Sequence, residues 1–336
     1  MTDSTICRDV AVFCTVKDEG PFILEWVAWS RLIGFSSIYI AQNDSTDGTI
    51  ELLECLHDAG IITYLDNSFS TPNGGRPPSF QSRAYRLFLK QAKTANLTWA
   101  MALDIDEFLY LLPSNKGVEE VGDLTDESID EIRLNWRFLS SPTEQHFVDK
   151  LVTSRFQMTK ELDAIEKNPT PVKTIFRVAN AKALGPHFPD AYIRKPRRII
   201  NGSGLDMVQS RKVSVTDPGG CSNAFVAHYR TKDLESFLMK GVRGLANINS
   251  TERYDQKYWE MANLASAELP VLAEQKVRIE NEISKIDLLT AGHAKKLHRN
   301  SVQNWNQKIK SLLKNPEFMR LAQEVDPTYR PRSSNF

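Results

Sequence analysis

The sequence WAMALDIDEFLYLL, residues 99–112, places three acidic side chains at the end of an apolar run. Residues 99–103 have the character of a buried strand, Asp104 and Asp106 follow with one residue between them, and Glu107 comes next. Like charges this close repel each other and are costly to remove from water, so a cation or a hydrogen-bond network normally compensates them. The stretch therefore indicates a buried strand with a functional site at its end.

The residues before this stretch alternate between strand and helix patterns. Apolar runs predict strands at residues 10–16, 36–42, 61–65 and 98–104, and the segments between them predict helices at 21–34, 49–60 and 80–95. Such alternation implies right-handed crossovers and a mainly parallel sheet, in which ligands bind at the carboxyl ends of the strands. The predicted fold class is α/β, with a Rossmann-like, mostly parallel sheet flanked by helices.

Two further strand ends are polar and lie at the same predicted edge. The first strand runs into TVKDEGP, residues 15–21, and the second into QNDSTDGT, residues 42–49. The second loop leads into a helix N-terminus, where free backbone N–H groups favour anions and polar ligands. An Asx turn with a helix cap explains NDSTDG equally well when it is taken alone. Three polar strand ends at one edge favour a binding site.

These three motifs, in this order and at this spacing, resemble the nucleotide-sugar half of a family 2 glycosyltransferase with the GT-A fold. The likeness covers residues 10–112, in the branch whose first motif reads like KDEGPFILEWVAWSRLIGF. Asn43 stands where many relatives carry an aspartate that contacts the nucleotide base. The resemblance implies an inverting transfer of a sugar from a nucleotide-diphosphate donor. It places these residues at the donor: Thr15, Lys17, Glu19, Asn43, Asp47 and Asp104.

The DxD motif, Asp104-Ile105-Asp106, also suggests a metal site. In an extended segment residues two apart point the same way, so both carboxylates would address one ion, and hard carboxylate oxygens suit Mg²⁺ or Mn²⁺. By resemblance, Asp106 is a direct ligand, Asp104 reaches the ribose or a metal-bound water, and His228 is a third ligand. A structural role for His228 is the alternative. UDP is the favoured donor nucleotide, because the amide of Asn43 can bond a uracil edge.

Residues after the fourth strand are candidates for the acceptor and phosphate side. Trp136, in a strand predicted at residues 129–139, would either stack on a sugar ring or belong to the core. Lys240 and Arg243, on a helix predicted at residues 233–243, would either neutralise the diphosphate or face solvent. An inverting reaction needs a general base near the acceptor hydroxyl. The sequence leaves four candidates for it: Glu107, Glu144, Asp190 and Asp206.

The composition is that of an ordinary globular protein. The 336 residues include 42 basic and 42 acidic side chains, so no net charge indicates a nucleic-acid partner. The four cysteines form no CxxC pair, and the first residues lack the pattern of a signal peptide. No apolar run approaches the ~18 residues of a membrane span. We therefore expect a cytoplasmic protein without a transmembrane segment.

The sequence predicts two parts, a GT-A catalytic domain at residues 8–250 and a helical C-terminal extension at residues 251–336. Residues 291–336 hold nine basic and three acidic side chains. In this part Val302, Trp305 and Ile309 recur at helical spacing, which favours packing over disorder. Packing against the catalytic domain is the favoured interpretation. Contact with a polyanionic acceptor or an anionic membrane surface is the alternative.

Three other classes of protein compete with this interpretation. A nucleotidyltransferase would share the sheet and its carboxylates, but usually has a glycine-rich, basic phosphate loop where this chain has KDEGPF. A phosphatase of the haloacid dehalogenase type needs its DxD motif after the first strand, whereas here it follows the fourth. A GT-A module that only binds sugar or nucleotide is disfavoured by the intact DxD motif and by His228.

Overall fold

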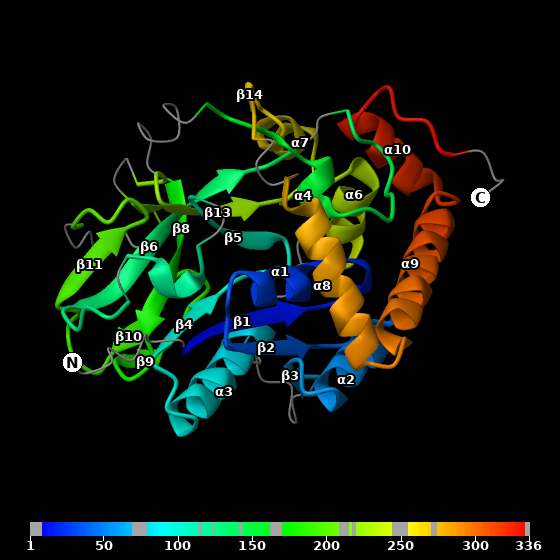
Figure 1. Ribbon diagram of the computed structural model, residues 1–336. Coiled ribbons are helices and arrows are strands. Elements are labelled where there is room, and N and C mark those ends of the chain that lie inside the picture. The colour runs from blue at the N-terminus through cyan, green and yellow to red at the C-terminus, as the bar shows by residue number, and fades with distance from the viewer. Residues whose placement is uncertain are drawn as a thin grey trace, which may run out of the picture.

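The computed structural model describes most of the chain and shows a large sheet with helices on both faces (Figure 1). The described residues are 9–68, 79–113, 116–122, 124–140, 143–161, 170–207, 215–216, 220–243, 255–269 and 274–332. The strands are β1 Val10–Val16, β2 Ser37–Gln42, β3 Thr63–Asp66, β4 Trp99–Ala102, β5 Glu107–Leu111, β6 Ile129–Phe138, β7 Met158–Thr159, β8 Thr170–Arg177, β9 Ala181–Ala183, β10 Ala191–Tyr192, β11 Arg198–Asn201, β12 Val215–Thr216, β13 Ala224–His228 and β14 Ala267–Glu268. The helices are α1 Gly20–Leu32, α2 Thr49–Asp58, α3 Phe80–Thr94, α4 Val152–Arg155, α6 Leu234–Arg243, α7 Gln256–Ala262, α8 Lys276–Leu289, α9 His293–Leu312 and α10 Pro316–Val325.

The main sheet has the strand order β3-β2-β1-β4-β8-β6-β13-β5. Strands β3, β2, β1 and β4 are parallel, β8 runs antiparallel to both β4 and β6, and β13 runs parallel to β6. The strand-helix alternation predicted for the first hundred residues is therefore confirmed, and so is the α/β fold class. The carboxyl ends of β1, β2 and β4 lie at one edge, where the sequence places its polar loops.

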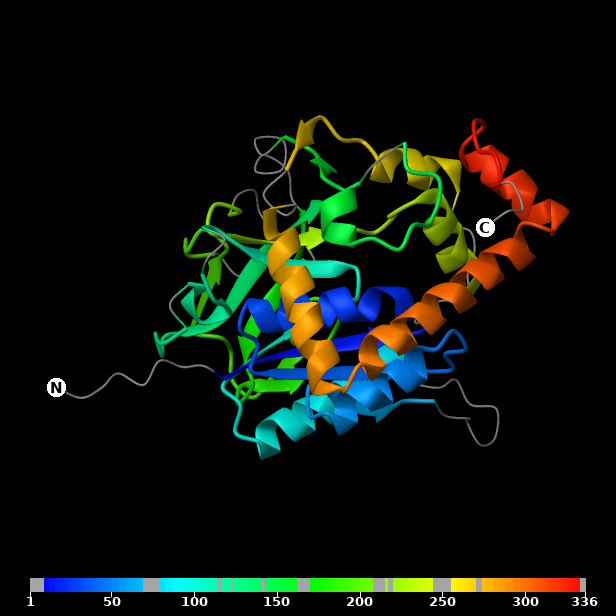
Figure 2. The same ribbon diagram turned by 45° about the vertical axis from the view of Figure 1, so that its right-hand side comes forward.

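Strand β1 is buried on both faces, as its continuous apolar sequence requires. Val10, Val12 and Cys14 belong to the larger core, which includes side chains of α1, α2, α8 and α9. Ala11 and Phe13 point to the other face, into a second core with side chains of α3. Figures 1 and 2 show α3 and the α1–α8–α9 group on opposite sides of the sheet.

The C-terminal helices pack on the sheet domain. Ile279 and Ile286 of α8 and Trp305 and Ile309 of α9 are buried in the same core cluster as the side chains of α1. This confirms the predicted packing of the apolar face of α9. A third cluster joins α10 to α6 and α7. The predicted domain boundary at residue 250 falls outside the described residues and stays a prediction. Among the described helices, none is both long enough and apolar enough to cross a membrane.

Among the strands that the sequence did not predict, β5 directly follows the DxD motif. Residues Glu107–Leu111 form β5, which pairs antiparallel with β13, from Leu111 opposite Ala224 to Glu107 opposite His228. This pairing joins segments far apart in the chain, so local periodicity carries no signal for it. The pairing brings Glu107 and His228 to the same end of the sheet.

Candidate active site

Two of the polar loops interlock through hydrogen bonds. The loop after β1 donates three successive backbone N–H groups to side chains of the loop after β2. These are Asp18 to Ser45 Oγ at 3.1 Å, Glu19 to Thr49 Oγ1 at 3.1 Å and Gly20 to Asp47 Oδ2 at 2.9 Å. Every one of these polar groups is buried, so the bonds fix the two loops against each other.

Asp47, one of the predicted donor residues, bonds the backbone of both loops. Its side chain is fully buried. Its Oδ2 accepts from the Gly20 N–H and its Oδ1 from the Thr49 N–H at 3.0 Å. Burial raises the pKa of Asp47, although the bonds to Thr49 and Gly20 oppose this. Both oxygens of Asp47 thus help to join the loops, and its predicted contact with the donor stays a prediction.

The other predicted donor residues line the same strand ends. Thr15 and Lys17 are half-buried at the end of β1, while Glu19 and Asn43 are buried. The Asn43 N–H donates to the carbonyl of Val16 at 3.3 Å, which holds the ends of the two strands side by side. These residues therefore lie together, at the edge where the sequence predicted the nucleotide.

The DxD motif forms a turn between β4 and β5, and not the extended segment that we expected. The Glu107 N–H donates to the Asp104 carbonyl at 2.9 Å, and the Glu107 carboxylate accepts from the Asp104 N–H at 2.8 Å. In a turn, residues two apart do not point the same way. Asp104 and Asp106 consequently contact different partners.

Two lysines compensate the carboxylates. The Nζ of Lys173, from β8, lies 3.0 Å from Asp104 Oδ2 and 3.0 Å from Glu107 Oε2. The Nζ of Lys240, from α6, contacts Asp106 Oδ2. Burial opposes the charge of Lys173, but Asp104 and Glu107 raise its pKa. The cation that the acidic stretch requires is therefore supplied in this structure by the protein itself.

His228 lies between the acidic side chains at the end of β13. Its Nε2 is 3.7 Å from Asp106 Oδ1 and its Nδ1 is 3.9 Å from Glu107 Oε1. Burial lowers the pKa of His228, against the opposing effect of Asp106. Burial also opposes the charge of Asp106, yet the ammonium of Lys240 holds the pKa of Asp106 well below its usual range. At neutral pH the site thus pairs an ionised Asp106 with a neutral imidazole.

These two side chains fit a divalent cation. Asp106 Oδ1 and His228 Nε2 are 3.7 Å apart, a separation that an ion with ligand distances of about 2.1 Å can bridge. Lys240 contacts the other oxygen, Oδ2, so the two cations need not compete for one atom. Within the described residues, no group of three or more His, Cys, Asp or Glu side chains is arranged to hold a metal. A bound ion would therefore need further oxygens from a ligand or water.

Trp136 adjoins this cluster. Its ring centroid is 4.4 Å from that of His228 and 5.3 Å from that of His187. The Nδ1 of His187 contacts the Val172 carbonyl at 2.9 Å, and burial lowers the pKa of His187. Trp136 is half-buried and packs against the core. Both roles that the sequence left open for it, core packing and contact with a ligand, are compatible with this position.

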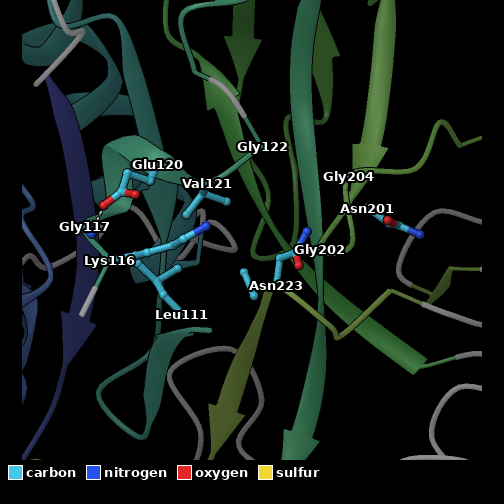
Figure 3. Close-up of a pocket in the computed structure, with 11 residues that line it drawn as sticks. Leu111, Lys116, Gly117, Glu120, Val121, Gly122, Asn201, Gly202, Gly204 and Asn223 are labelled. Carbon is cyan, nitrogen blue, oxygen red and sulfur yellow. Dashed lines mark hydrogen bonds between the residues drawn. The ribbon is translucent and has the colours of Figure 1, made fainter. Parts of the chain in front are cut away.

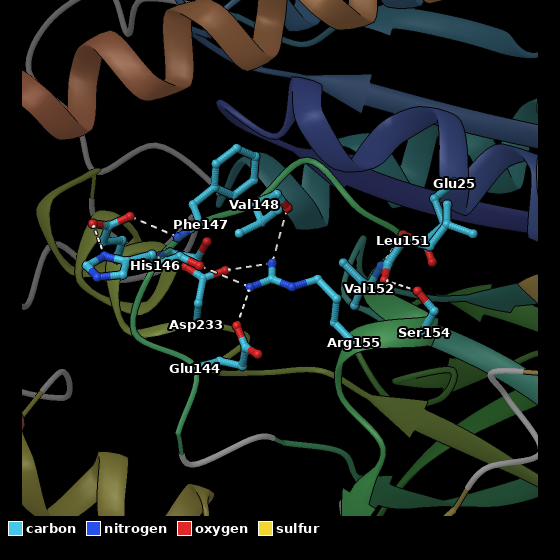
Figure 4. A network of polar contacts seen from close by, with 12 residues as sticks. Glu25, Glu144, His146, Phe147, Val148, Leu151, Val152, Ser154, Arg155 and Asp233 are labelled. Carbon is cyan, nitrogen blue, oxygen red and sulfur yellow. Dashed lines mark hydrogen bonds and ion pairs between the residues drawn. The ribbon is translucent and has the colours of Figure 1, made fainter. Parts of the chain in front are cut away.

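The four candidate bases occupy four different environments. Glu107 is fully buried beneath His228. Glu144 lies 2.9 Å from Arg155, which also contacts Asp233 (Figure 4). Asp190 is exposed, and its charge interacts with that of His187, the neighbour of Trp136. Of these three, Asp190 is therefore the exposed one and the one that interacts with His187.

Asp206 and Arg243 complete the predicted set. Asp206 forms a short ion pair with Arg198, 2.5 Å between Oδ1 and Nε, beside β11. Strand β11 pairs with the beginning of β6, Arg198 opposite Ile129, whereas β13 and His228 pair with its end. The structure does not bring Asp206 to the carboxylate cluster. Arg243 is the last residue of α6, and its side chain lies outside the described part of the chain.

Residues 13–269, more than half of the chain, match the model of glycosyltransferase family 92. The chain belongs to glycosyltransferase family 92. The expected class, a glycosyltransferase, is confirmed, and the family found is family 92, where the motifs resembled family 2. No curated protein sequence gives a significant match to this glycosyltransferase.

Solved structures that resemble the glycosyltransferase are distant. A Bacillus anthracis protein assigned as a glucose-1-phosphate thymidylyltransferase is 9% identical and has a TM-score of 0.28, with 51% of this chain and 71% of that chain covered. A glycosyltransferase involved in glycosylating the major capsid of PBCV-1 is 15% identical with a TM-score of 0.20, and the coverage is 38% and 51%. A cytidylyltransferase from Leptospira borgpetersenii is 11% identical with a TM-score of 0.24, and the coverage is 50% and 59%. At such low scores we draw no further argument from them.

A small cavity lies at the other end of the β5–β13 pair (Figure 3). It holds about 40 Å³ and is lined by residues that include Leu111, at the end of β5, and Ala224, at the start of β13. Glu107 and His228 stand at the opposite ends of these two strands. The cavity has room for water but not for a nucleotide sugar, so it is separate from the candidate site of the glycosyltransferase.

Lys173 and His187 lie at the candidate site, and the sequence did not single them out. Lys173 lies in the strand sequence VKTIFRV, where its charge among apolar residues was the available signal. It is fully buried, and a lysine is almost never fully buried unless it is paired. His187 lies in a proline-bounded loop, GPHFPD, where no periodicity indicates its position.

Proposed function

We propose that this glycosyltransferase transfers a sugar from a nucleoside-diphosphate sugar, with UDP as the favoured nucleotide, to an acceptor hydroxyl. The observation that carries the proposal is the cluster after β4, where the carboxylate of Asp106 lies within contact range of both His228 and Lys240. It combines a carboxylate, a neutral imidazole and an ammonium group, which are the groups needed to hold a diphosphate and an ion.

The donor would lie across the carboxyl ends of β1, β2 and β4. We propose that Thr15, Lys17, Glu19 and Asn43 contact the nucleoside and that Asp104 contacts the ribose. Asp104 suits this role because its side chain is 37% exposed. Its Oδ1 accepts from Gln81 at 3.2 Å and its Oδ2 from Lys173 at 3.0 Å, which fixes its orientation.

We propose that Asp106 and His228 hold Mn²⁺ or Mg²⁺ together with the donor diphosphate. Such an ion neutralises the charge that grows on the leaving diphosphate as the glycosidic bond breaks. Lys240, and Arg243 on the same helix, would add positive charge on the phosphate side. The acceptor would approach at Trp136, whose ring can stack on a sugar. We also propose that the transfer is inverting and that the protein is cytoplasmic. The basic C-terminal part would contact a membrane peripherally.

The test is a thermal-shift panel of nucleoside diphosphates and their sugars, each measured with and without Mn²⁺. A ligand that binds only the folded state raises the melting temperature by mass action. We expect UDP and UDP-sugars to stabilise the protein more in the presence of Mn²⁺ than in its absence. If no nucleoside diphosphate shifts the melting temperature under either condition, the proposed function is wrong.

His228→Ala is expected to weaken Mn²⁺ binding in the presence of UDP by at least about tenfold. Only the neutral imidazole can ligate, so wild-type affinity should decline as the pH falls through the pKa of His228. Burial lowers that pKa, so the decline should come below the ordinary histidine value of about 6.5. Calorimetric titration with Mn²⁺ at several pH values measures both effects.

His57→Ala is the matched control, because His57 is exposed on α2. It should reproduce the wild-type affinities and their pH dependence. If His228→Ala also reproduces them and only lowers the melting temperature, His228 is a packing residue, and Asp106 would be left to hold the ion with oxygens from the donor and water.

A further inference from the structure

Helix α9 lies directly against the two interlocked loops. It packs beside α2 and α1 (Figure 2), and its Ser301 faces the glycines of both loops. A Cβ atom on Gly20 would lie 2.6 Å from Ser301 Cβ, and one on Gly48 would lie 2.8 Å from Ser301 Oγ. Glycine at these two positions therefore permits the close approach of α9, and Gly48 also has a φ of +97°.

The next turns of α9 make polar contacts with the same loops. The side-chain amide of Asn304 donates to the Asp47 carbonyl at 3.2 Å. The Nζ of Lys308 lies 2.9 Å from Asp18 Oδ1 and 2.7 Å from Thr46 Oγ1. Lys308 thus joins one residue of each loop. Residues 301, 304 and 308 follow at helical spacing, which aims all three at the loops.

Lys308 contacts Asp18, a residue whose backbone conformation is uncommon for residues other than glycine. Asp18 is not a glycine, yet it has a φ of +49°, a region that few residues adopt. Its carboxylate is mostly buried, and its Oδ1 accepts from the Thr46 N–H at 2.7 Å as well as from Lys308. A buried carboxylate is costly to remove from water unless hydrogen bonds or a cation compensate it, and Lys308 supplies the cation here. Asp18 separates Lys17 from Glu19, the two residues that we place at the donor.

We propose that Lys308 is a positioning residue of the donor site, through which the C-terminal helix sets the two loops that receive the nucleoside diphosphate. This inference rests on the proposed function. It extends the donor site beyond residues 13–269, the part that matches the family model, because Lys308 lies outside them. Trp305, on the same helix, is buried against Phe22 and Phe147, so α9 is held in place independently of Lys308.

The experiment uses the full chain and three variants, Lys308→Met, Lys308→Arg and Lys314→Met. Lys314 is exposed just beyond the end of α9 and is the matched control. Calorimetry with UDP and Mn²⁺ should give about tenfold weaker UDP binding for Lys308→Met, since a charge-assisted contact is lost. Lys308→Arg should recover most of the affinity, and Lys314→Met should match wild type.

Hydrogen exchange tests the positioning role without any nucleotide. In Lys308→Met the N–H groups of Asp18, Glu19, Gly20 and Thr46 should exchange faster than in wild type, because their hydrogen bonds depend on the docked loops. Exchange in α3, on the other face of the sheet, should not change. A change spread over the whole chain would show that Lys308 only stabilises the fold, and would overturn the inference.

The binding outcomes separate this inference from the proposed function. If wild type binds UDP and Lys308→Met binds it equally well, the inference is wrong and the proposed function stands. If wild type binds no nucleoside diphosphate, both are wrong. If wild type binds UDP, Lys308→Met loses affinity and Lys308→Arg does not recover it, the charge at this position is not what sets the loops, and the inference is also overturned.

Discussion

Asp106→Asn is expected to lower the rate of sugar transfer about 10³-fold and to remove the effect of Mn²⁺ on UDP binding. An amide keeps the shape of the side chain but loses the charge that an ion and Lys240 require. In the structure Asp106 faces His228 with one oxygen and Lys240 with the other. No other carboxylate among the described residues contacts both His228 and Lys240. We therefore expect that no neighbouring carboxylate takes over the role of Asp106.

The stability of this variant distinguishes two electrostatic effects. Repulsion between Asp104 and Asp106 alone would make the asparagine variant more stable. However, each carboxylate has its own lysine, and Asp106→Asn leaves the mostly buried ammonium of Lys240 without its counter-ion. Removing one partner of a buried ion pair costs more stability than the relief of the Asp104–Asp106 repulsion restores. We therefore expect a lower melting temperature in the absence of UDP.

Asp206→Asn is the matched control for both measurements. It removes a carboxylate of the same size from the far end of β6, where Asp206 pairs with Arg198. Transfer and UDP affinity should stay at the wild-type level. Calorimetry of UDP with and without Mn²⁺ gives the decisive comparison. A wild-type response to Mn²⁺ in Asp106→Asn would remove Asp106 from the metal site.

The parts of this molecule that the sequence predicted are those fixed by local patterns. The parallel half of the sheet follows from apolar runs alternating with helices, and the acidic stretch at residues 104–107 follows a predicted strand directly. Carboxyl ends of parallel strands share one edge, so the convergence of the loops after β1, β2 and β4 needed no tertiary information.

The lysines that neutralise the acidic side chains could not be predicted from local patterns. Lys173 reaches Asp104 across 69 positions of the chain, and Lys240 reaches Asp106 across 134. Lys308 reaches Asp18 across 290. No local period links such pairs, so the sequence indicated the need for a cation but not which cation meets it. The turn at Asp104–Glu107 was missed for a different reason: the Glu107 side chain bonds the Asp104 N–H only three residues before it, and the apolar pattern carries no sign of that bond.

Lys173→Met is expected to destabilise the fold by about 3–5 kcal/mol, because it leaves the buried carboxylate of Glu107 without its cation. Lys173 is fully buried, and its Nζ lies 3.0 Å from both Asp104 and Glu107. Glu107 is also fully buried, so water cannot replace the lost ammonium. Urea unfolding at pH 7 measures the loss. Lys90→Met, at an exposed position of α3, is the control and should unfold like wild type.

The pH dependence of this variant identifies the carboxylate that is responsible. Burial already raises the pKa of Glu107 in the wild type, against the lowering effect of Lys173, and removing the lysine raises that pKa further. A carboxyl group whose pKa is higher in the folded state binds more protons there. Its favourable contribution is therefore present at low pH and is lost as the pH rises through the folded-state pKa. The Lys173→Met defect should then be smaller at pH 5 than at pH 7.

A second substitution separates charge from packing. Glu107→Gln removes the buried anion, so the double variant Lys173→Met/Glu107→Gln should recover a large part of the stability that Lys173→Met loses, and its stability should depend less on pH. The double-mutant cycle isolates the coupling between the two side chains. If the two losses simply add, Lys173 acts by filling space beside Trp136, 6.0 Å from its ring centroid, and the buried ion pair is not what holds this edge of the sheet together.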